Sequence, residues 1–216
     1  MRWHRTASLA LAGLVLAASW HPGCAEEGKK QPSEAFRKKF LEDFPRTGIN
    51  TTPQDALLLR ILVETGHAQR GIEVGSANGY GALNMGIGFE RTGGHLYTIE
   101  IDPRRARECR ANIRKMGLQE SVTCVEGDAL EVLPGMEGTF DFLFLDAVKS
   151  DYLKYLKAVE ARLKPGAVVV ADNTIRYAGA MRDFLDYIRR SPDYEMVTVR
   201  ASDAKRDGMS IIYKIR

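Results

Sequence analysis

Two runs of consecutive apolar residues constrain the fold of this chain most strongly. They are FDFLFLD at 140–146 and AVVVAD at 167–172, and neither alternates between apolar and polar side chains as a half-exposed strand would. A continuous apolar run of this length is typical of a strand that is buried on both faces of a parallel sheet. The sequence therefore predicts an α/β fold in which helices cover both faces of a mostly parallel, doubly wound sheet.

Short apolar runs alternate with amphipathic stretches from residue 69 onward. Helices are expected from Ser33 to about residue 44 and from Pro53 onward, and then near residues 79–90, 103–117, 150–163 and 178–190. Strands are expected near residues 70–74, 95–101, 121–126, 140–145 and 167–171. The last two runs, YEMVTVR and GMSIIYKI, have a polar connection without helical period, so we expect them to pair antiparallel at one edge. Together these elements predict one Rossmann-like domain with a seven-stranded sheet at 33–216.

The first 25 residues differ in composition from the rest of the chain. Arg2 and Arg5 precede an uncharged run at 6–20, and small residues near its end offer a cleavage position. The run is shorter than the ~20 apolar residues that span a bilayer, so no stable membrane span is expected. We expect residues 1–25 to be a signal peptide, 26–32 to be a linker, and the protein to be exported to the periplasm or secreted. The alternative is a disordered or amphipathic extension on a cytoplasmic protein.

The charge pattern and the cysteines carry fewer predictions. The net charge is +3, and the charged residues, 27% of the chain, mix both signs without a cluster. This pattern does not favour a nucleic-acid or polybasic membrane surface, and a homodimer is an open possibility. Cys24 would leave with the signal peptide or carry a lipid. Cys109 and Cys124 are predicted to be buried, unpaired thiols.

A glycine-rich segment, GIEVGSANGYG at 71–81, lies where the first strand gives way to a helix. Gly75, Gly79 and Gly81 would let the backbone approach a ligand closely, and the helix start offers free N–H groups to an anion. The spacing G-x-x-x-G-x-G differs from the dinucleotide pattern G-x-G-x-x-G. By itself the segment predicts a ligand loop without naming the ligand.

Acidic residues end the next two strands. Glu100 follows the second strand, at the edge where ligands of open α/β sheets bind, and its carboxylate suits the two hydroxyls of a ribose. Asp128 follows the third strand, where it could accept a hydrogen bond from an adenine amino group. Capping of the following helix is the equally open alternative for Asp128.

The fourth and fifth strands end in residues that suit a metal. Asp146 ends the fourth strand with Lys149 on the loop after it, and Asp172 and Asn173 end the fifth. Neighbouring parallel strands lie about 4.8 Å apart, so these two carboxylates and one amide oxygen can converge on one hard cation. Such an oxygen set, completed by water or substrate, suits Mg²⁺.

Four segments together resemble a known family. EVGSANGYG, YTIEID, FLDAVKSDYL and ADN are similar to motifs of the metal-dependent catechol and caffeoyl-CoA O-methyltransferases, which belong to the class I S-adenosylmethionine-dependent enzymes. The resemblance covers roughly residues 50–215. It implies an enzyme that transfers the methyl group of S-adenosylmethionine to a hydroxyl of a small, phenolic acceptor, with a divalent cation such as Mg²⁺ assisting the deprotonation.

The resemblance also implies a role for each matching residue. Asp146, Asp172 and Asn173 would bind the metal, and Lys149 would be the general base. The implied cofactor-binding residues are Thr51, Glu73, Gly75, Ser76, Gly79, Tyr80, Gly81, Glu100, Asp128, Ala129 and Asp146. Gly81 departs from the family, which usually has a serine there, and Val148 and Ala204 depart at acceptor positions, which argues against catechol itself as the acceptor.

Two other functions stay open from the sequence. In the first, Asp172 and Asn173 form only a turn, and the chain is a metal-independent methyltransferase or a nonenzymatic S-adenosylmethionine-binding protein. The second is a nucleotide-dependent oxidoreductase. The α/β pattern and Glu100 favour the oxidoreductase, whereas the glycine spacing and the antiparallel tail oppose it.

Overall fold

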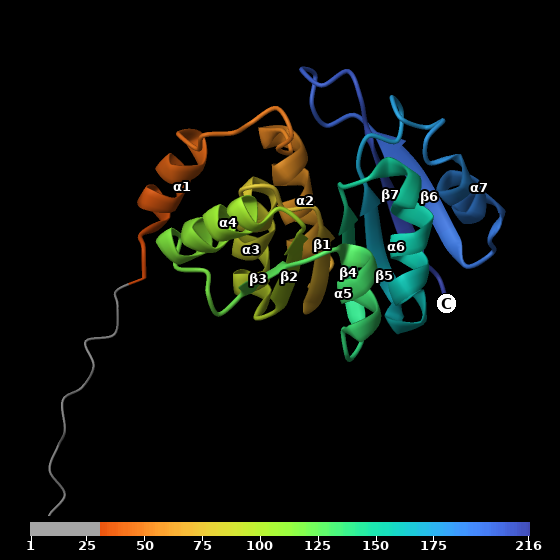
Figure 1. Ribbon diagram of the computed structural model, residues 1–216, viewed down its shortest axis with the longest axis horizontal. Helices are drawn as coiled ribbons and strands as arrows, with labels where there is room; N and C mark the ends of the chain where they lie inside the picture. Colours follow the sequence, from red (N-terminus) through yellow and green to blue (C-terminus); the bar gives the residue numbers. More distant parts are fainter. Residues whose placement is uncertain (1–30) are drawn as a thin grey trace, which may run out of the picture. The chain divides into compact units, whose positions relative to one another are not determined.

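A seven-stranded sheet runs through residues 31–216, the part of the chain that the computed structural model describes (Figure 1). Its strands stand in the order β3-β2-β1-β4-β5-β7-β6, and only β7 runs antiparallel to its neighbours. The strands are β1 (Arg70–Val74), β2 (His95–Glu100), β3 (Val122–Glu126), β4 (Phe140–Leu145), β5 (Leu163–Ala171), β6 (Tyr194–Val199) and β7 (Met209–Lys214). The predicted fold class is confirmed, including the antiparallel pairing of the last two strands.

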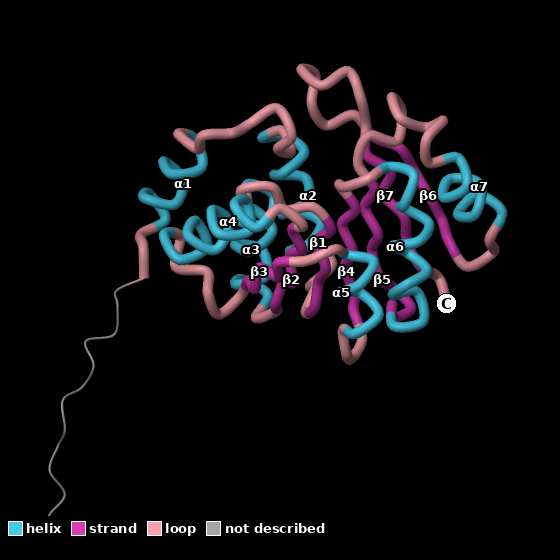
Figure 2. Tube along the Cα trace, viewed as in Figure 1, coloured by secondary structure: helices cyan, strands magenta, loops and turns pink. Residues whose placement is uncertain are grey.

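Helices surround this sheet, as Figure 2 shows in cyan. They are α1 (Glu34–Glu42), α2 (Pro53–Thr65), α3 (Tyr80–Thr92), α4 (Pro103–Lys115), α5 (Ala129–Gly135), α6 (Tyr152–Val159) and α7 (Arg182–Arg190), with short 3₁₀ turns at Lys149–Asp151 and Glu160–Arg162. One hydrophobic cluster joins α2, α3 and α4 to the sheet, and a second joins α5, α6 and α7 to it. Because each cluster contains side chains of the same central strands, the two clusters cover opposite faces.

The burial of strand β4 explains why its sequence is apolar from Phe142 to Leu145. Phe142 and Phe144 belong to the cluster with α2 and α3, whereas Leu143 and Leu145 belong to the cluster with α6 and α7. All four side chains are at most 1% exposed. Successive side chains of a strand point to opposite faces, so the buried part of a central strand between two helical layers needs apolar residues facing both layers.

The structure differs from the sequence prediction at three places. Helix α5 is missing from the predicted helix ranges, although capping by Asp128 implied a helix there, because Pro134 and Gly135 in so short a segment are typical of a loop. Strand β5 begins at Leu163, four positions before the predicted start, since Pro165 and Gly166 resemble a turn. Helix α7 begins at Arg182, after a series of turns that extends from the end of β5.

The predicted signal peptide at 1–25 and nearly all of the predicted linker lie outside the described residues. Export of the protein therefore stays a prediction from the sequence. Within residues 31–216, the structure contains no helix with the length and apolar character needed to cross a bilayer.

Gly75 allows the ends of β1 and β4 to approach each other. Its φ angle is +95°, and a Cβ atom at this position would lie 2.3 Å from the backbone oxygen of Asp146. Only glycine adopts this backbone conformation readily, and no other residue fits the space. The glycine therefore fixes the carboxyl edge of the sheet, where β1, β4 and β5 end side by side.

We predict that Gly75→Ala lowers the free energy of unfolding by about 1–3 kcal/mol, because the new Cβ meets backbone and the φ angle is unfavourable. Gly135→Ala is the matched control, since nothing lies within 4 Å of its Cβ position. Urea unfolding followed by circular dichroism measures both variants. Equal stability of Gly75→Ala and the parent chain would contradict the close approach of these strands.

Candidate active site

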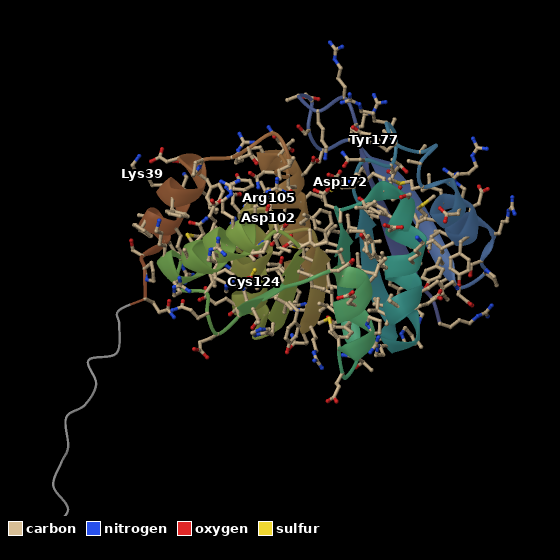
Figure 3. The ribbon with its side chains drawn as sticks, in the orientation of Figure 1. Lys39, Asp102, Arg105, Cys124, Asp172 and Tyr177 are labelled. Carbon is tan, nitrogen blue, oxygen red and sulfur yellow. The ribbon has the colours of Figure 1, made fainter. Side chains whose placement is uncertain are left out.

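A cavity of about 600 Å³ opens at the carboxyl edge of the sheet. In Figure 3, Asp172 and Tyr177 mark one side of this region, and Asp102 and Arg105 lie at the N-terminal end of α4. Open α/β sheets bind their ligands at this edge. The predicted site residues that line the cavity are Gly75, Glu100, Asp128, Ala129, Asp146, Lys149, Asp172 and Asn173.

Glu100 is held in place by backbone donors. The Ala77 N–H donates to its Oε2 at 2.7 Å, and the Asp102 N–H donates to its Oε1 at 3.0 Å. The residue is 5% exposed and lines the cavity. Each carboxylate oxygen has further lone pairs, so Glu100 can still accept hydrogen bonds from a diol.

Three predicted residues of the glycine-rich segment, Ser76, Gly79 and Tyr80, pack behind the cavity and do not line it. Ser76 is 3% exposed and lies against the buried thiols, and a Cβ at Gly79 would lie 2.9 Å from the Cys109 Sγ. The Tyr80 ring packs on Phe44, with ring centroids 5.2 Å apart.

Asp128 caps helix α5. Its Oδ1 accepts the Leu130 N–H at 2.8 Å, so the capping interpretation is confirmed. Asp128 and Ala129 also line the cavity. The second carboxylate oxygen of Asp128 has no part in this cap bond, and the predicted contact with an adenine stays a prediction.

Lys149 lies at the centre of a hydrogen-bonded group. Its Nζ donates to Asp146 Oδ1 and to the Tyr152 hydroxyl, both at 2.8 Å. Burial raises the pKa of Tyr152 well above its ordinary value, so the hydroxyl stays protonated. It donates a hydrogen bond to the Asp172 backbone oxygen at 3.3 Å. The Lys149 and Asp146 side chains are 18% and 14% exposed. Lys149 is thus fixed between the ends of β4 and β5.

Asp172 and Asn173 form a tight turn after β5. The Asn173 N–H donates to Asp172 Oδ1 at 2.7 Å, and Asn173 has a φ angle of +62°, which asparagine tolerates better than most residues. Its side-chain amide donates to Asp207 Oδ2 at 3.0 Å. Burial, reinforced by the charge of Asp146, raises the pKa of Asp172 to about 6.

Sequence reasoning missed three charged residues next to this turn. Lys205 contacts Asp172 and Asp55. Although burial acts to raise it, N–H donors of the backbone hold the pKa of Asp207 below its ordinary value. Asp207 precedes a glycine and a strand, as turn residues often do, and Asp55 lies in a first helical turn, where acids are common. Lys205 lies in a polar loop, and no sequence pattern around it indicated a role in the site.

The chemistry of Asp146, Asp172 and Asn173 fits a hard divalent cation. Two carboxylates and one amide oxygen are the donors that Mg²⁺ prefers. Because the Asn173 amide nitrogen is bonded to Asp207, its oxygen is left as the acceptor. Within residues 31–216, no group of three His, Cys, Asp or Glu side chains gathers to hold a metal. The predicted set has only two such side chains, and each is paired with a lysine.

Comparison with known protein families shows which family this chain belongs to. The model of the O-methyltransferase family matches residues 32–205, which is most of the chain. The chain belongs to the O-methyltransferase family. This membership confirms the resemblance drawn from the four motifs and stands against the oxidoreductase alternative.

Individual relatives agree with the family match. A catechol O-methyltransferase of Niastella koreensis is 33% identical over 132 residues, which are 59% of each chain, so the match covers less than two thirds of that relative. A probable O-methyltransferase of Mycobacterium tuberculosis is 32% identical over 176 residues, 76% of this chain and 71% of the relative. The crystal structure of an O-methyltransferase from Bacillus cereus in complex with SAH has a TM-score of 0.72 at 23% identity, covering 85% of this chain and 92% of that one.

Gly81 lies against a buried acid. A Cβ at Gly81 would lie 2.6 Å from Glu73 Oε1 and 3.3 Å from Thr51 Oγ1. Glu73 is 1% exposed, and its Oε2 accepts a hydrogen bond from the Thr98 hydroxyl. Burial raises the pKa of Glu73 to about 8, although the bond from Thr98 acts against it. Glu73, Thr51 and Gly81 therefore meet behind the cavity, and glycine leaves room for the acid.

We predict that stability falls as pH rises from about 4.5 to about 8, because folded Glu73 holds a proton that the unfolded chain releases at lower pH. The contribution of protonated Glu73 to the free energy of unfolding is fully present below pH 4.5 and is lost above pH 8. Glu73→Gln removes this dependence, so its free energy of unfolding relative to the parent chain increases across that window.

Urea unfolding at several pH values measures the difference, with Glu64→Gln as the control, since Glu64 forms a partly exposed ion pair with Arg91. A pH dependence that is identical in Glu73→Gln and in the parent chain would rule out a buried, protonated Glu73.

Proposed function

We propose that this protein transfers the methyl group of S-adenosylmethionine to a hydroxyl of a small, phenolic acceptor, assisted by a divalent cation. One observation carries the proposal: a single cavity is lined both by Glu100, held by two N–H groups, and by the group of Asp146, Lys149, Asp172 and Asn173. The first feature suits a nucleoside, and the second suits the activation of a hydroxyl. Family membership supports the same reaction.

The cofactor would lie across the ends of β1, β2 and β3. Glu100 would accept the ribose hydroxyls, and Asp128 with Ala129 would border the adenine. The methionine part would lie over the glycine-rich loop, in front of Glu73. The ammonium group of the cofactor is a suitable partner for Glu73, because a positive charge would offset the cost of ionising a buried carboxyl.

Asp146, Asp172 and Asn173 would hold the divalent cation beside the acceptor. A cation there lowers the pKa of an acceptor hydroxyl, which for a phenol is ordinarily about 10. The cavity side of this group also contains Val148, whose side chain is 56% exposed and can contact the ring of an acceptor.

Lys149 would take the proton of the acceptor hydroxyl. Its Nζ is held by Asp146 and Tyr152, so the amine has a fixed position when it is neutral. The methyl group on a sulfonium is already activated, and the remaining task of the protein is to align oxygen, methyl carbon and sulfur. Such alignment is catalysis by positioning.

A metal-independent methyltransferase is the second candidate. One observation favours it: Lys149 and Lys205 neutralise Asp146 and Asp172 with no metal required. In that case Lys149 alone would promote loss of the hydroxyl proton. Chelation of divalent cations separates the two candidates.

We predict that Glu100→Ala weakens the binding of S-adenosylmethionine by about 1.5–3 kcal/mol, the usual value of hydrogen bonds to a charged group. Glu126→Ala is the matched control, because Glu126 lies opposite Glu100 in the register of β2 and β3 and pairs with Arg110 outside the cavity. Isothermal titration calorimetry measures both affinities. Unchanged affinity in Glu100→Ala would refute the ribose assignment.

We predict that a chelator abolishes methyl transfer to a phenol and that added Mg²⁺ or Mn²⁺ restores it. Lys149→Ala should still bind the metal while its turnover falls by roughly 10²- to 10⁴-fold, the usual contribution of a positioned base. The loss should be greater for less acidic hydroxyls, which depend more on the base. Product formation measured by mass spectrometry tests both effects, and full activity in chelator would favour the metal-independent candidate.

A further inference from the structure

Lys205 is a partly buried lysine that bridges two buried aspartates. Its Nζ contacts Asp172 Oδ2 and lies 3.3 Å from Asp55 Oδ2. The Lys205 side chain is 17% exposed, and those of Asp55 and Asp172 are 4% and 2% exposed. The three residues come from the loop between β6 and β7, from α2 and from the end of β5. The lysine therefore links three separate elements at the wall of the cavity.

The two oxygens of Asp172 have different partners. Oδ1 accepts the Asn173 N–H at 2.7 Å, which belongs to the tight turn after β5. Oδ2 is the oxygen that Lys205 occupies. A divalent cation that approaches Asp172 through Oδ2 would meet the ammonium group there. Two cations at one carboxylate oxygen repel each other strongly where water is scarce.

The Asp55 carboxylate is a second partner for the Lys205 ammonium group. Among the ion pairs of the described residues, Lys205 is the cationic partner of Asp55. A carboxylate this deeply buried is unstable without a positive charge nearby. If the lysine left Asp172, a small movement would bring it closer to Asp55, which already lies 3.3 Å away.

We propose that Lys205 is an internal counter-ion that competes with the divalent cation for Asp172, and that Asp55 receives its ammonium group when the cation binds. The proposal rests on the proposed metal site, and it does not depend on which acceptor is methylated. Lys205 is thus a positioning residue that sets the metal affinity. In the metal-free protein the two aspartates share this one lysine.

Titration of Mn²⁺ into the full-length protein by isothermal calorimetry tests the competition. Lys205→Met should bind Mn²⁺ about tenfold more tightly or better, because a charge-assisted bond no longer has to break. Asp55→Asn should bind Mn²⁺ several-fold more weakly, because the ammonium loses its second partner. Lys164→Met is the control: Lys164 pairs with Asp141 at 3.4 Å near the start of β5, its side chain is 45% exposed, and its loss should leave the affinity unchanged.

Thermal unfolding gives a second readout that needs no catalysis. In chelator, Lys205→Met should unfold at a lower temperature than the parent chain, since two buried carboxylates lose their counter-ion. Mn²⁺ should raise its unfolding temperature more than that of the parent chain. If Lys205→Met does not fold, the Mn²⁺ affinity of Asp55→Asn tests the competition: weaker binding than in the parent chain supports it, and equal binding overturns it.

The outcomes separate this inference from the proposed function. Equal Mn²⁺ affinity in the parent chain, Lys205→Met and Asp55→Asn would overturn the competition and leave the metal site standing. Absence of Mn²⁺ binding in all of them would overturn the competition together with the metal assistance in the proposed function. Opposite shifts in the two variants, with no change in Lys164→Met, would support the inference.

Discussion

The crowding of carboxylates at one edge of the sheet is the constraint on which the rest of the site depends. Parallel strands end at the same edge, so Glu73, Glu100, Asp146 and Asp172 are brought together by topology. Each acid needs a proton, an N–H donor or a cation when it is buried. The structure supplies all three: a raised pKa at Glu73, backbone donors at Glu100, and lysines at the two aspartates.

This arrangement links stability to function. The groups that stabilise the acids in the free protein stand where a cofactor and a cation would bind. The cofactor ammonium would replace the proton on Glu73, and the cation would replace Lys205 at Asp172. Gly81 leaves room for the Glu73 carboxyl, because a side chain at this position would collide with it. In the proposed function, binding would thus exchange one form of charge compensation for another.

Much of the fold followed from the sequence, because buried parallel strands have a continuous apolar pattern and the site residues follow those strands directly. Asp146 and Asp172 were found this way. Asp55 and Lys205 were not, because their meeting depends on how α2 and the loop after β6 pack, and no local pattern records a contact between residues 150 positions apart. The cap formed by Asp128 could be confirmed only from the position of α5, and the adenine contact of the same residue stays a prediction.

A crystal structure of the protein with S-adenosylhomocysteine and Mn²⁺ tests the central claim most directly. The account predicts that the ribose hydroxyls bond to Glu100 and that the anomalous signal of Mn²⁺ lies between Asp146, Asp172 and Asn173, with the Lys205 ammonium on Asp55. A nucleoside bound away from Glu100, or Mn²⁺ held elsewhere while Lys205 stays on Asp172, would contradict it.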